Sequence, residues 1–434
     1  MIPVVTSDNS LYQSLSSILK HCENEPDTFH LSDSRSAMEY LSIEMPELVV
    51  IDFSDENLEI DSLAEEIRQD PWLLNSGIIG LTCHPRELRK SDRLLGLNVL
   101  ALIHHGMIEQ QLPGVIRIIC HNRRILSQRF IGADLGSNIS ISFQLENDPL
   151  EAYCFTNLIC NFLYNLNKID ANGKDQLNVV LVELLINAIE HGNCGISYEE
   201  KSQWLESGGD IFQLIQKKCS KPEIARRKVL LDYTIKPTHT SFRIEDEGEG
   251  FEWQELRHKA DPRNLLDLHG RGIIISSGIT ENLTFNEKGN CVTFDFQHQE
   301  GIANVTPALF KNLQTVSINK GDIIFHEGEF CNYLYYIVRG SFEVLVEGTP
   351  VSVLTPDDIF IGEMSFLLNN KRSATVRATS EASLIKISKK DFVEGIREKP
   401  HYSLFLSKLL AKRIERLNHM ISHNHNLETC NSKK

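Results

Sequence analysis

The chain has 434 residues, a length typical of two to four domains. Hydrophobic residues make up 41% and charged residues 24%, an ordinary composition for a globular protein. The formal net charge of -15 disfavours nucleic-acid binding, which needs a basic surface. No run of about eighteen apolar residues and no signal-peptide pattern occurs, so we expect no membrane contact and a cytoplasmic location. The 10 cysteines include no Cys-x-x-Cys pair, which disfavours a zinc site or a disulfide framework.

The first part of the chain, residues 1–125, alternates short apolar runs with amphipathic stretches. Alternating β and α segments predict a doubly wound parallel sheet. The run Pro46–Phe53 resembles the third strand of a response-regulator receiver domain, which implies that Asp52 is a candidate phospho-acceptor. Thr82 matches the switch hydroxyl of the same family.

Two charged groups of the receiver family are absent from this stretch. A receiver holds Mg²⁺ with an acidic pair after its first strand, whereas this chain has Ser7 and Asp8. The Lys expected after the fifth strand is replaced by His104 and His105. Without these charges, phosphorylation of Asp52 is poorly supported. We therefore favour a degenerate receiver that serves for docking or dimerisation over a phosphorylated one, and we interpret the histidines as polar surface rather than a pH switch.

The middle of the chain, which follows a predicted linker at residues 126–136, places a carboxylate and a carboxamide within an apolar helix. Glu183 and Asn187 are four residues apart, so they share one face of that helix. Burying either group without a partner would cost about 1–3 kcal/mol, which favours a ligand, a metal or a polar network. The neutral carbonyl oxygen of Asn187 suits the Mg²⁺ that accompanies a nucleotide. Glu183 is then a candidate general base.

Two glycine-containing stretches follow this helix. In the first, a predicted strand ends at Asp246 and is followed by Gly248 and Gly250. Glycine at such positions lets the backbone approach a flat ligand closely. The second stretch opens a predicted helix, where backbone N–H groups can meet phosphates. It consists of Gly270, Arg271 and Gly272.

In this order, the three stretches resemble the N, G1 and G2 boxes of the Bergerat ATP-binding fold. The pattern Glu-x-x-x-Asn-Ala-x-x-His-Gly-Asn is most similar to the anti-sigma factor serine kinases. The resemblance covers residues 137–298 and implies an α/β sandwich in which Glu183 is the base and Asn187 the Mg²⁺ ligand. The residues that it implies for ATP binding, from adenine to phosphates, are Asp246, Gly248, Gly250, Gly270, Arg271 and Gly272.

Two further features bear on this domain. A polar insertion at residues 197–227 is either a surface excursion or a functional loop beside the site, and both interpretations stay open. No upstream segment resembles the dimerisation helices of a histidine kinase with their phospho-accepting His. A histidine kinase is therefore disfavoured.

Residues 305–425 contain short apolar runs separated by glycine turns, which are typical of a β-barrel or jelly roll. The stretch Ile361–Val376 resembles the phosphate-binding cassette of cyclic nucleotide-binding domains. The resemblance implies a short helix at Met364–Leu368 that aims N–H groups at the cyclic phosphate, and a terminal helix at Tyr402–Ile421. Residues 426–434 are predicted to be a disordered tail.

The cassette implies a specific set of ligand contacts. Arg372 would pair with the phosphate and Glu363 would accept the ribose 2′-hydroxyl, with Gly362 between the strand and the helix. The hydroxyls of Ser373 and Thr375 bear on the choice of nucleotide, and we favour cyclic AMP over cyclic GMP. A domain of this type that has lost its ligand is the alternative.

The sequence thus predicts a multidomain α/β and α+β protein, and we interpret it as a cyclic nucleotide-regulated, Mg-ATP-dependent serine/threonine protein kinase. Its expected substrate is a STAS-domain anti-sigma antagonist, a sigma factor is a further candidate partner, and a homodimer is expected. The expected cofactors are ATP, Mg²⁺ and a cyclic nucleotide. The alternative is a non-catalytic switch, in which ATP occupancy shapes a surface that holds a sigma factor or an antagonist. Because such a switch needs no base, Glu183 distinguishes the two.

Overall fold

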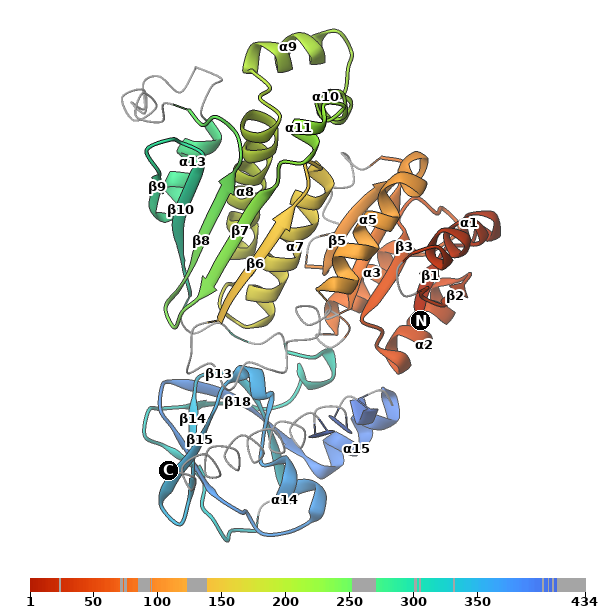
Figure 1. Ribbon diagram of the computed structural model, residues 1–434. Coiled ribbons are helices and arrows are strands. Elements are labelled where there is room, and N and C mark those ends of the chain that lie inside the picture. Colours follow the sequence, from red (N-terminus) through yellow and green to blue (C-terminus); the bar gives the residue numbers. More distant parts are fainter. Residues whose placement is uncertain are drawn as a thin grey trace, which may run out of the picture.

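The computed structural model describes residues 1–22, 25–70, 73, 76–84, 94, 96–122, 139–251, 271–299, 303, 306–330, 332–399, 402–404, 406–407 and 410–411. The described elements form an N-terminal parallel sheet, a central antiparallel sheet with helices, and a C-terminal β-sandwich (Figure 1). The predicted linker at 126–136, the predicted tail at 426–434 and Gly270 lie outside the described residues.

The N-terminal unit has a five-stranded parallel sheet in the order β2-β1-β3-β4-β5. Its strands and the helices around it are β1 (Ile2–Val5), β2 (Thr28–Leu31), β3 (Leu48–Asp52), β4 (Gly77–Thr82), β5 (Val99–His104), α1 (Asn9–Lys20), α2 (Ser34–Glu44), α3 (Ile60–Gln69) and α5 (Ile108–His121). α1 and α5 pack on one face, and α2 and α3 pack on the other. Every residue of β3 and β4 is buried, as expected for a sheet covered on both sides. The predicted doubly wound sheet is confirmed, whereas the receiver assignment stays a prediction.

The central unit has an antiparallel sheet in the order β6-β7-β8-β10-β9. Its elements are β6 (Ile139–Leu145), β7 (Val229–Ile235), β8 (His239–Asp246), β9 (Glu281–Phe285), β10 (Cys291–Gln297), α7 (Pro149–Asn165), α8 (Ala171–Asn187), the π-helical segment η6 (Ala188–Asn193) and α13 (Arg271–Ile279). Side chains along β7 and β8 alternate between buried and half-buried, because one face of the sheet lies under the helices. These two layers form an α/β sandwich, and its assignment to the Bergerat fold stays a prediction.

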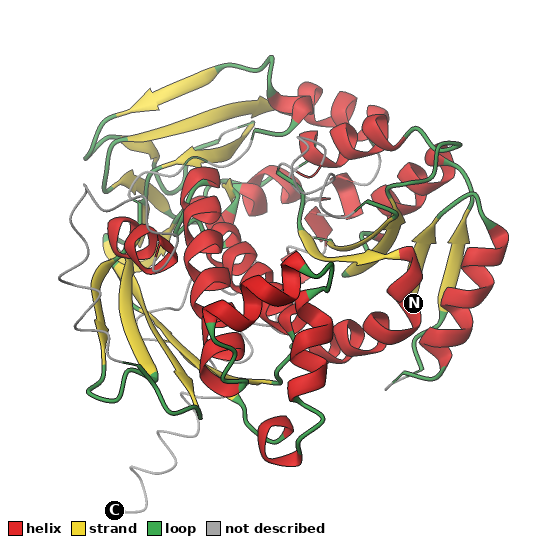
Figure 2. Ribbon diagram, turned by 90° about the horizontal axis from the view of Figure 1, so that it is seen from above, coloured by secondary structure: helices red, strands yellow, loops and turns green. Residues whose placement is uncertain are grey.

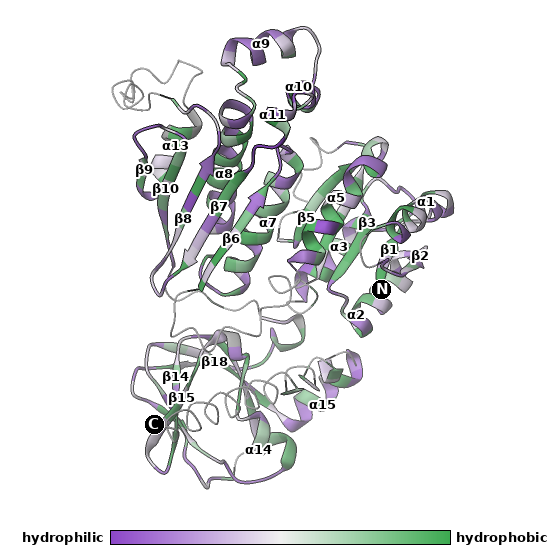
Figure 3. Cartoon of the chain, in the orientation of Figure 1, coloured by the Kyte–Doolittle hydropathy of each residue, from purple (hydrophilic) through white to green (hydrophobic). Residues whose placement is uncertain are grey.

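The N-terminal and central units share one hydrophobic core, in which residues of β5 and α5 pack with residues of α7. Figure 2 shows red helices in the middle of the molecule with yellow strands on either side, and Figure 3 colours much of β5 as hydrophobic. Polar contacts tie the same junction. The amide of Asn157 donates to the carbonyl oxygen of Leu100 at 3.0 Å, and Arg117 lies 3.2 Å from Glu151. Apolar burial therefore holds these two units together.

The polar insertion is ordered and folds as α9 (Tyr198–Glu206), α10 (Ile211–Lys218) and α11 (Pro222–Ala225). Leu214 and Ile215 on α10 are buried in the same core. Within the described residues, no single helix is long and apolar enough to cross a membrane. The helices Ala171–Asn193 and Tyr198–Glu206 pass that test of length and composition only as a pair, bent by 99°.

The C-terminal unit consists of two antiparallel four-stranded sheets, in the orders β11-β18-β13-β16 and β12-β17-β14-β15. Its elements are β11 (Thr315–Ile318), β12 (Ile323–Phe325), β13 (Tyr333–Arg339), β14 (Phe342–Val346), β15 (Thr349–Leu354), β16 (Phe360–Ile361), β17 (Thr375–Ala378), β18 (Ala382–Ser388), α14 (Glu363–Leu368) and α15 (Lys389–Glu398). The predicted β architecture is confirmed. The cassette helix begins at Glu363, one residue before its predicted start.

The start of the predicted terminal helix packs into the C-terminal unit. Residues 402–404, 406–407 and 410–411 are helical, and the remainder of Tyr402–Ile421 lies outside the described residues. Tyr402 and Leu406 are buried in a cluster with Phe310, and Met45 from the end of α2 packs against that cluster. The described part of this helix therefore lies beside the N-terminal unit.

Candidate nucleotide sites

A cavity of about 610 Å³ opens at the end of the central unit beside α9. The site residues Glu183, Asn187, Asp246 and Gly250, which were predicted from three separate stretches, all line it. Ala188, His191 and Gly192 of the sequence pattern also line it. The structure adds lining residues that the sequence did not single out: Leu184, Tyr198, Lys201, Ile244, Phe251, Ile273, Ile275, Phe285, Gly289, Asn290, Cys291 and Val292. Most of these walls are apolar, with polar groups at a few positions, as is usual for a small-molecule site.

Glu183 and Asn187 lie one turn apart on α8 and are both half-buried, as their spacing predicts. The amide nitrogen of Asn187 donates to a carboxylate oxygen of Glu183 at 3.2 Å. This bond uses the nitrogen and not the carbonyl oxygen of Asn187, whose role as a Mg²⁺ ligand stays a prediction. The described residues contain no cluster of three or more His, Cys, Asp or Glu side chains suited to a metal.

Asp246 ends β8 and is only 8% exposed. Burial raises the pKa of its carboxyl to about 6, although the N–H of Gly248, which donates to it at 2.8 Å, acts in the opposite direction. Its backbone N–H and carbonyl are both bonded to Asn290, at 2.9 and 2.6 Å. The backbone is thus fixed, while the contacts of the carboxylate offset only part of the hydration that it loses on burial. An N–H donor on a bound ligand would stabilise the ionised form.

Glycines create the space around Asp246. A Cβ on Gly192 would lie 2.4 Å from the Asp246 carboxyl carbon, and one on Gly248 would lie 2.2 Å from the carbonyl oxygen of Gly192. Gly250 has φ +81°, and a Cβ there would meet the backbone of Lys288 at 1.9 Å. The end of η6 and the turn after β8 therefore approach each other as only glycine permits. This close approach fits the predicted contact with a flat ring.

The π-helical segment η6 continues α8 directly beside the cavity. The N–H of Cys194 bonds to the carbonyl oxygen of Ile189 at 2.9 Å, which is the wider spacing of a π-turn. Glu190 on this segment is 3% exposed and pairs with Lys201 on α9 at 2.5 Å. The pair fastens the insertion to the cavity wall. Tyr198 and Lys201 of the insertion line the cavity, and a functional role for the insertion stays a prediction.

The second glycine stretch is described only in part. The described part of α13 runs from Arg271 to Ile279 and includes Gly272. Gly270 lies outside the described residues, as does the segment 252–269 that precedes it. The role of Gly270, Arg271 and Gly272 in phosphate binding stays a prediction.

In the C-terminal unit, the structure brings Gly362 and Arg372 together. Arg372 is 3% exposed and donates to the carbonyl oxygens of Gly362 and Tyr333, at 2.7 and 2.6 Å, and to the Ser365 hydroxyl at 2.6 Å. Its Nε is buried without a hydrogen-bond partner. The guanidinium carbon lies 4.0 Å from the ring centre of Phe325. The cation is thus held inside the cassette by neutral acceptors, with no carboxylate among these contacts.

The remaining cassette residues lie around α14, in the loop after it and at the start of β17. Gly362 precedes α14 with φ +81°, and a Cβ there would lie 2.1 Å from Arg372. Glu363 begins α14 and is 7% exposed. Ser373 is exposed, whereas the Thr375 hydroxyl accepts the N–H of Glu327 at 2.9 Å. Their roles in ligand binding stay predictions.

In the N-terminal unit, Asp52 ends β3 and is 4% exposed. Its carboxylate accepts the N–H of Ser54 at 3.0 Å and lies 3.0 Å from Nε2 of His105. Burial raises its pKa, and the contacts with Ser54 and His105 offset part of this effect. The interpretation of both histidines as polar surface is therefore wrong for His105. His104 is exposed and bonds only locally, to the N–H of Gly106 at 3.0 Å.

The first strand of this unit also has a carboxylate beside it that the sequence pattern did not indicate. Asp55 accepts the backbone N–H of Ser7 at 2.5 Å and its hydroxyl at 2.8 Å. Asp8 instead caps α1, where it accepts N–H groups of Ser10 and Leu11. The local turn after β3 brings Asp55 to this place across a separation of 48 residues in sequence.

Two family models match this chain. The model of the histidine kinase-like ATPase domain matches residues 158–296, and that of the cyclic nucleotide-binding domain matches residues 315–399. Both domains are therefore present, within the central and C-terminal units. ATP and a cyclic nucleotide are the ligand classes that these matches support.

Curated relatives share only part of the chain. The Pycsar effector protein BcPycTIR of Burkholderia cepacia is 31% identical over 110 residues, which are 25% of this chain and 36% of the relative. The voltage-gated inwardly rectifying potassium channel KCNH7 of Mus musculus is 36% identical over 98 residues, 22% of this chain and 8% of the relative. Among solved structures, the catabolite activator protein of Thermus thermophilus is 25% identical with a TM-score of 0.25, over 26% of this chain and 55% of that one. The chain thus spans a minor share of these curated relatives.

Proposed function

We propose that this protein is a Mg²⁺- and ATP-dependent serine/threonine protein kinase whose activity a cyclic nucleotide regulates. The observation that carries the proposal is the placement of Glu183, Asn187 and Asp246 around one cavity. A carboxylate beside a carboxamide occupies one wall, and a second, buried carboxylate lies at the glycine-lined part of the cavity. These groups have distinct tasks in phosphoryl transfer.

Each residue has a role that follows from its chemistry. Asp246 accepts a ligand N–H, for which its only partly compensated carboxylate is suited. Asn187 contributes a neutral oxygen to Mg²⁺, which commonly takes one or two protein ligands and completes its shell with phosphates and water. Glu183, next to that oxygen, accepts the proton of the attacking hydroxyl. Bound Mg·ATP supplies the phosphoryl group and the charge that stabilises its transfer.

The substrate that we propose is a serine or threonine of an anti-sigma antagonist of the STAS type. The resemblance of the Asn-bearing helix to the anti-sigma factor serine kinases supports this choice. The test incubates the full chain with labelled ATP, Mg²⁺ and purified antagonist candidates, followed by acid treatment of the products. Acid-stable label on an antagonist is expected. Label that acid removes would indicate a phosphohistidine or an acyl phosphate and would overturn the assignment.

A second candidate function is a binding switch without catalysis. It is favoured by the contact of Glu190 with Lys201, because this pair links the cavity wall to the exposed insertion α9–α11. A nucleotide in the cavity could then alter a surface that holds a sigma factor or an antagonist. Antagonist binding that depends on ATP, without any transfer of label, would support this function over the first.

The proposed regulator is a cyclic nucleotide, with cyclic AMP preferred over cyclic GMP. Arg372 supports the binding of a cyclic phosphate, since it is a buried cation held only by neutral acceptors. Figure 1 places the C-terminal unit at the end of the central sheet opposite α9. Regulation of the kinase by the cyclic nucleotide needs two conformations of the chain that bind the cyclic nucleotide with different affinities.

A further inference from the structure

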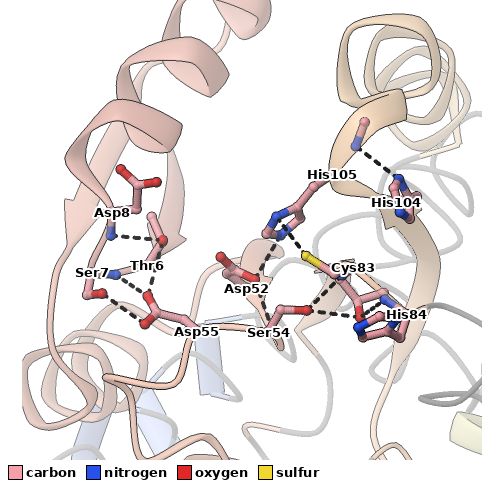
Figure 4. Close-up of polar contacts among 12 residues, drawn as sticks. Thr6, Ser7, Asp8, Asp52, Ser54, Asp55, Cys83, His84, His104 and His105 are labelled. Carbon is pink, nitrogen blue, oxygen red and sulfur yellow. Dashed lines mark hydrogen bonds and ion pairs between the residues drawn. The ribbon is translucent and has the colours of Figure 1, made fainter.

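Cys83, His105 and Asp52 form a continuous chain of contacts at the carboxyl end of the N-terminal sheet (Figure 4). The sulfur of Cys83 lies 3.5 Å from Nδ1 of His105, and Nε2 of the same ring lies 3.0 Å from Oδ1 of Asp52. The three residues come from the segment after β4, the short helix η3 (His105–Met107) and the end of β3. The fold thus assembles them from positions far apart in sequence.

The exposure of the three side chains falls from Cys83 through His105 to Asp52. Cys83 is exposed, the side chain of His105 is 29% exposed, and that of Asp52 is 5% exposed. This order resembles that of an accessible nucleophile, a base and a buried group that orients the base. Asp52 accepts the Nε2 proton, so Nδ1 is left as the acceptor that faces the thiol. A carboxylate behind the ring also stabilises the imidazolium that forms when the thiol gives up its proton.

We propose that Cys83 is a nucleophilic thiol, activated by His105 and Asp52, that reacts with small hydroperoxides. The thiol proton moves to Nδ1 of His105, and the thiolate sulfur attacks one oxygen of the peroxide. A sulfur–oxygen bond forms as the oxygen–oxygen bond breaks. The leaving group, hydroxide from hydrogen peroxide or alkoxide from an organic hydroperoxide, takes the proton from His105 and departs as water or an alcohol. The peroxide is reduced by two electrons, and Cys83 is oxidised by two electrons to a sulfenic acid.

The surrounding hydrogen bonds disfavour acyl transfer by the same thiol. That chemistry needs free N–H groups to bind an oxyanion. The N–H of Cys83 donates to the Ser54 hydroxyl at 2.7 Å, and the N–H of His84 donates to the Thr82 hydroxyl at 3.1 Å. Both donors next to the sulfur are therefore engaged. Attack on a small peroxide at an exposed sulfur has no such requirement.

Other cysteines of the described chain offer a contrast within the same molecule. Cys154 and Cys160 are buried, and burial raises the pKa of each thiol to about 12. Cys291 is half-buried, and burial raises its pKa as well. Among the cysteines that the structure describes, Cys83 combines exposure with an imidazole whose other nitrogen meets a carboxylate.

The test measures the reactivity of each cysteine in the folded full-length chain. The protein is treated with hydrogen peroxide and a sulfenic-acid trap, and in parallel with iodoacetamide, and labelled peptides are quantified by mass spectrometry over time. We expect Cys83 to react at least about tenfold faster than Cys291 with both reagents. The substitution His105→Gln is expected to slow Cys83 about tenfold and to leave Cys291 unchanged. His84→Gln, which changes the exposed histidine next to Cys83, is the matched control and is expected to have no effect.

The wild-type chain alone provides a second measurement that does not depend on the folding of any variant. The alkylation rates of Cys83 and Cys291 are followed from pH 5 to 9, and we expect Cys83 to react faster than Cys291 throughout this range. The titratable groups nearest this thiol are His105, which contacts the sulfur, Asp52, which contacts His105, and His84, which follows Cys83 in the chain. Equal rates for the two cysteines, or a rate at Cys83 that His105→Gln leaves unchanged, would overturn the proposal.

Discussion

Replacing Asp246 by Asn should stabilise the ligand-free protein at neutral pH while it removes nucleotide binding. Burial raises the pKa of Asp246 from 3.8 to about 6. At pH values between these two, the folded chain keeps a proton that the unfolded chain has lost. The stabilisation that the folded chain gains from this bound proton is fully present below about pH 4 and is lost as the pH rises through about 6. Because the two pKa values differ by about 2, the wild-type fold is about 3 kcal/mol less stable above that pH range than below it.

The substitution Asp246→Asn removes the ionisable group but keeps a side-chain oxygen. That oxygen can accept the N–H of Gly248, which lies 2.8 Å from Oδ1 in the wild type. At pH 8 the central unit of the variant should therefore unfold at a temperature up to about 10 °C higher than in the wild type. At pH 4 the two proteins should unfold at the same temperature, because both side chains are then neutral. Mg·ATP should raise the unfolding temperature of the wild type and leave that of the variant unchanged.

Scanning calorimetry of the full chain at pH 4, 6 and 8 measures these effects on the unfolding transition that includes the central unit. Asp175→Asn, which neutralises an exposed aspartate on α8, is the matched control and should show no gain at pH 8. A variant that is no more stable than the wild type at pH 8 would refute the reasoning from burial. So would a gain of equal size at pH 4.

Three further predictions concern the other sites. Acetyl phosphate with Mg²⁺ should leave Asp52 almost unlabelled, because its carboxylate is buried and bonded to His105, and stoichiometric labelling that Asp52→Asn abolishes would contradict this. Arg372→Gln should weaken cyclic AMP binding to the full chain by at least about tenfold in calorimetry. Lys371→Gln is its control, and equal affinities of the two variants would contradict the assignment. Lys201→Met should lower the stability of the central unit by about 1–3 kcal/mol in thermal unfolding, because it leaves a buried carboxylate unpaired, and adding Glu190→Gln should restore part of the loss.

The sequence predicted the N-terminal sheet and the C-terminal β architecture from their short apolar runs. β3 and β4, in which every residue is buried, show such a pattern clearly. β9 was missed because its residues are exposed or half-buried, so it lacks such a pattern. The two-residue strand β16 was missed because it is too short for any periodicity. Local hydrophobic patterns in the sequence thus predicted much of the fold.

The sequence predicted less of the sites, because several of their contacts join residues that are distant along the chain. Glu183 and Asn187 were found from their spacing on one helix, and Asp246 from its place before two glycines. The contact between His105 and Asp52 spans 53 residues, and no local pattern indicates it. Lys201 reaches the cavity only because α9 folds back onto η6. In sequence it is an ordinary lysine in a polar insertion.

The division of labour between Glu183 and Asn187 tests the central claim most directly. ATP affinity and the rate of a single phosphoryl transfer to the substrate should be measured for Glu183→Gln and Asn187→Ala in parallel with the wild type. The account predicts that Glu183→Gln retains ATP affinity and loses transfer by about 10²-fold or more, because only the base is removed. It predicts that Asn187→Ala loses Mg²⁺-dependent ATP binding. Transfer by Glu183→Gln at the wild-type rate would contradict the account.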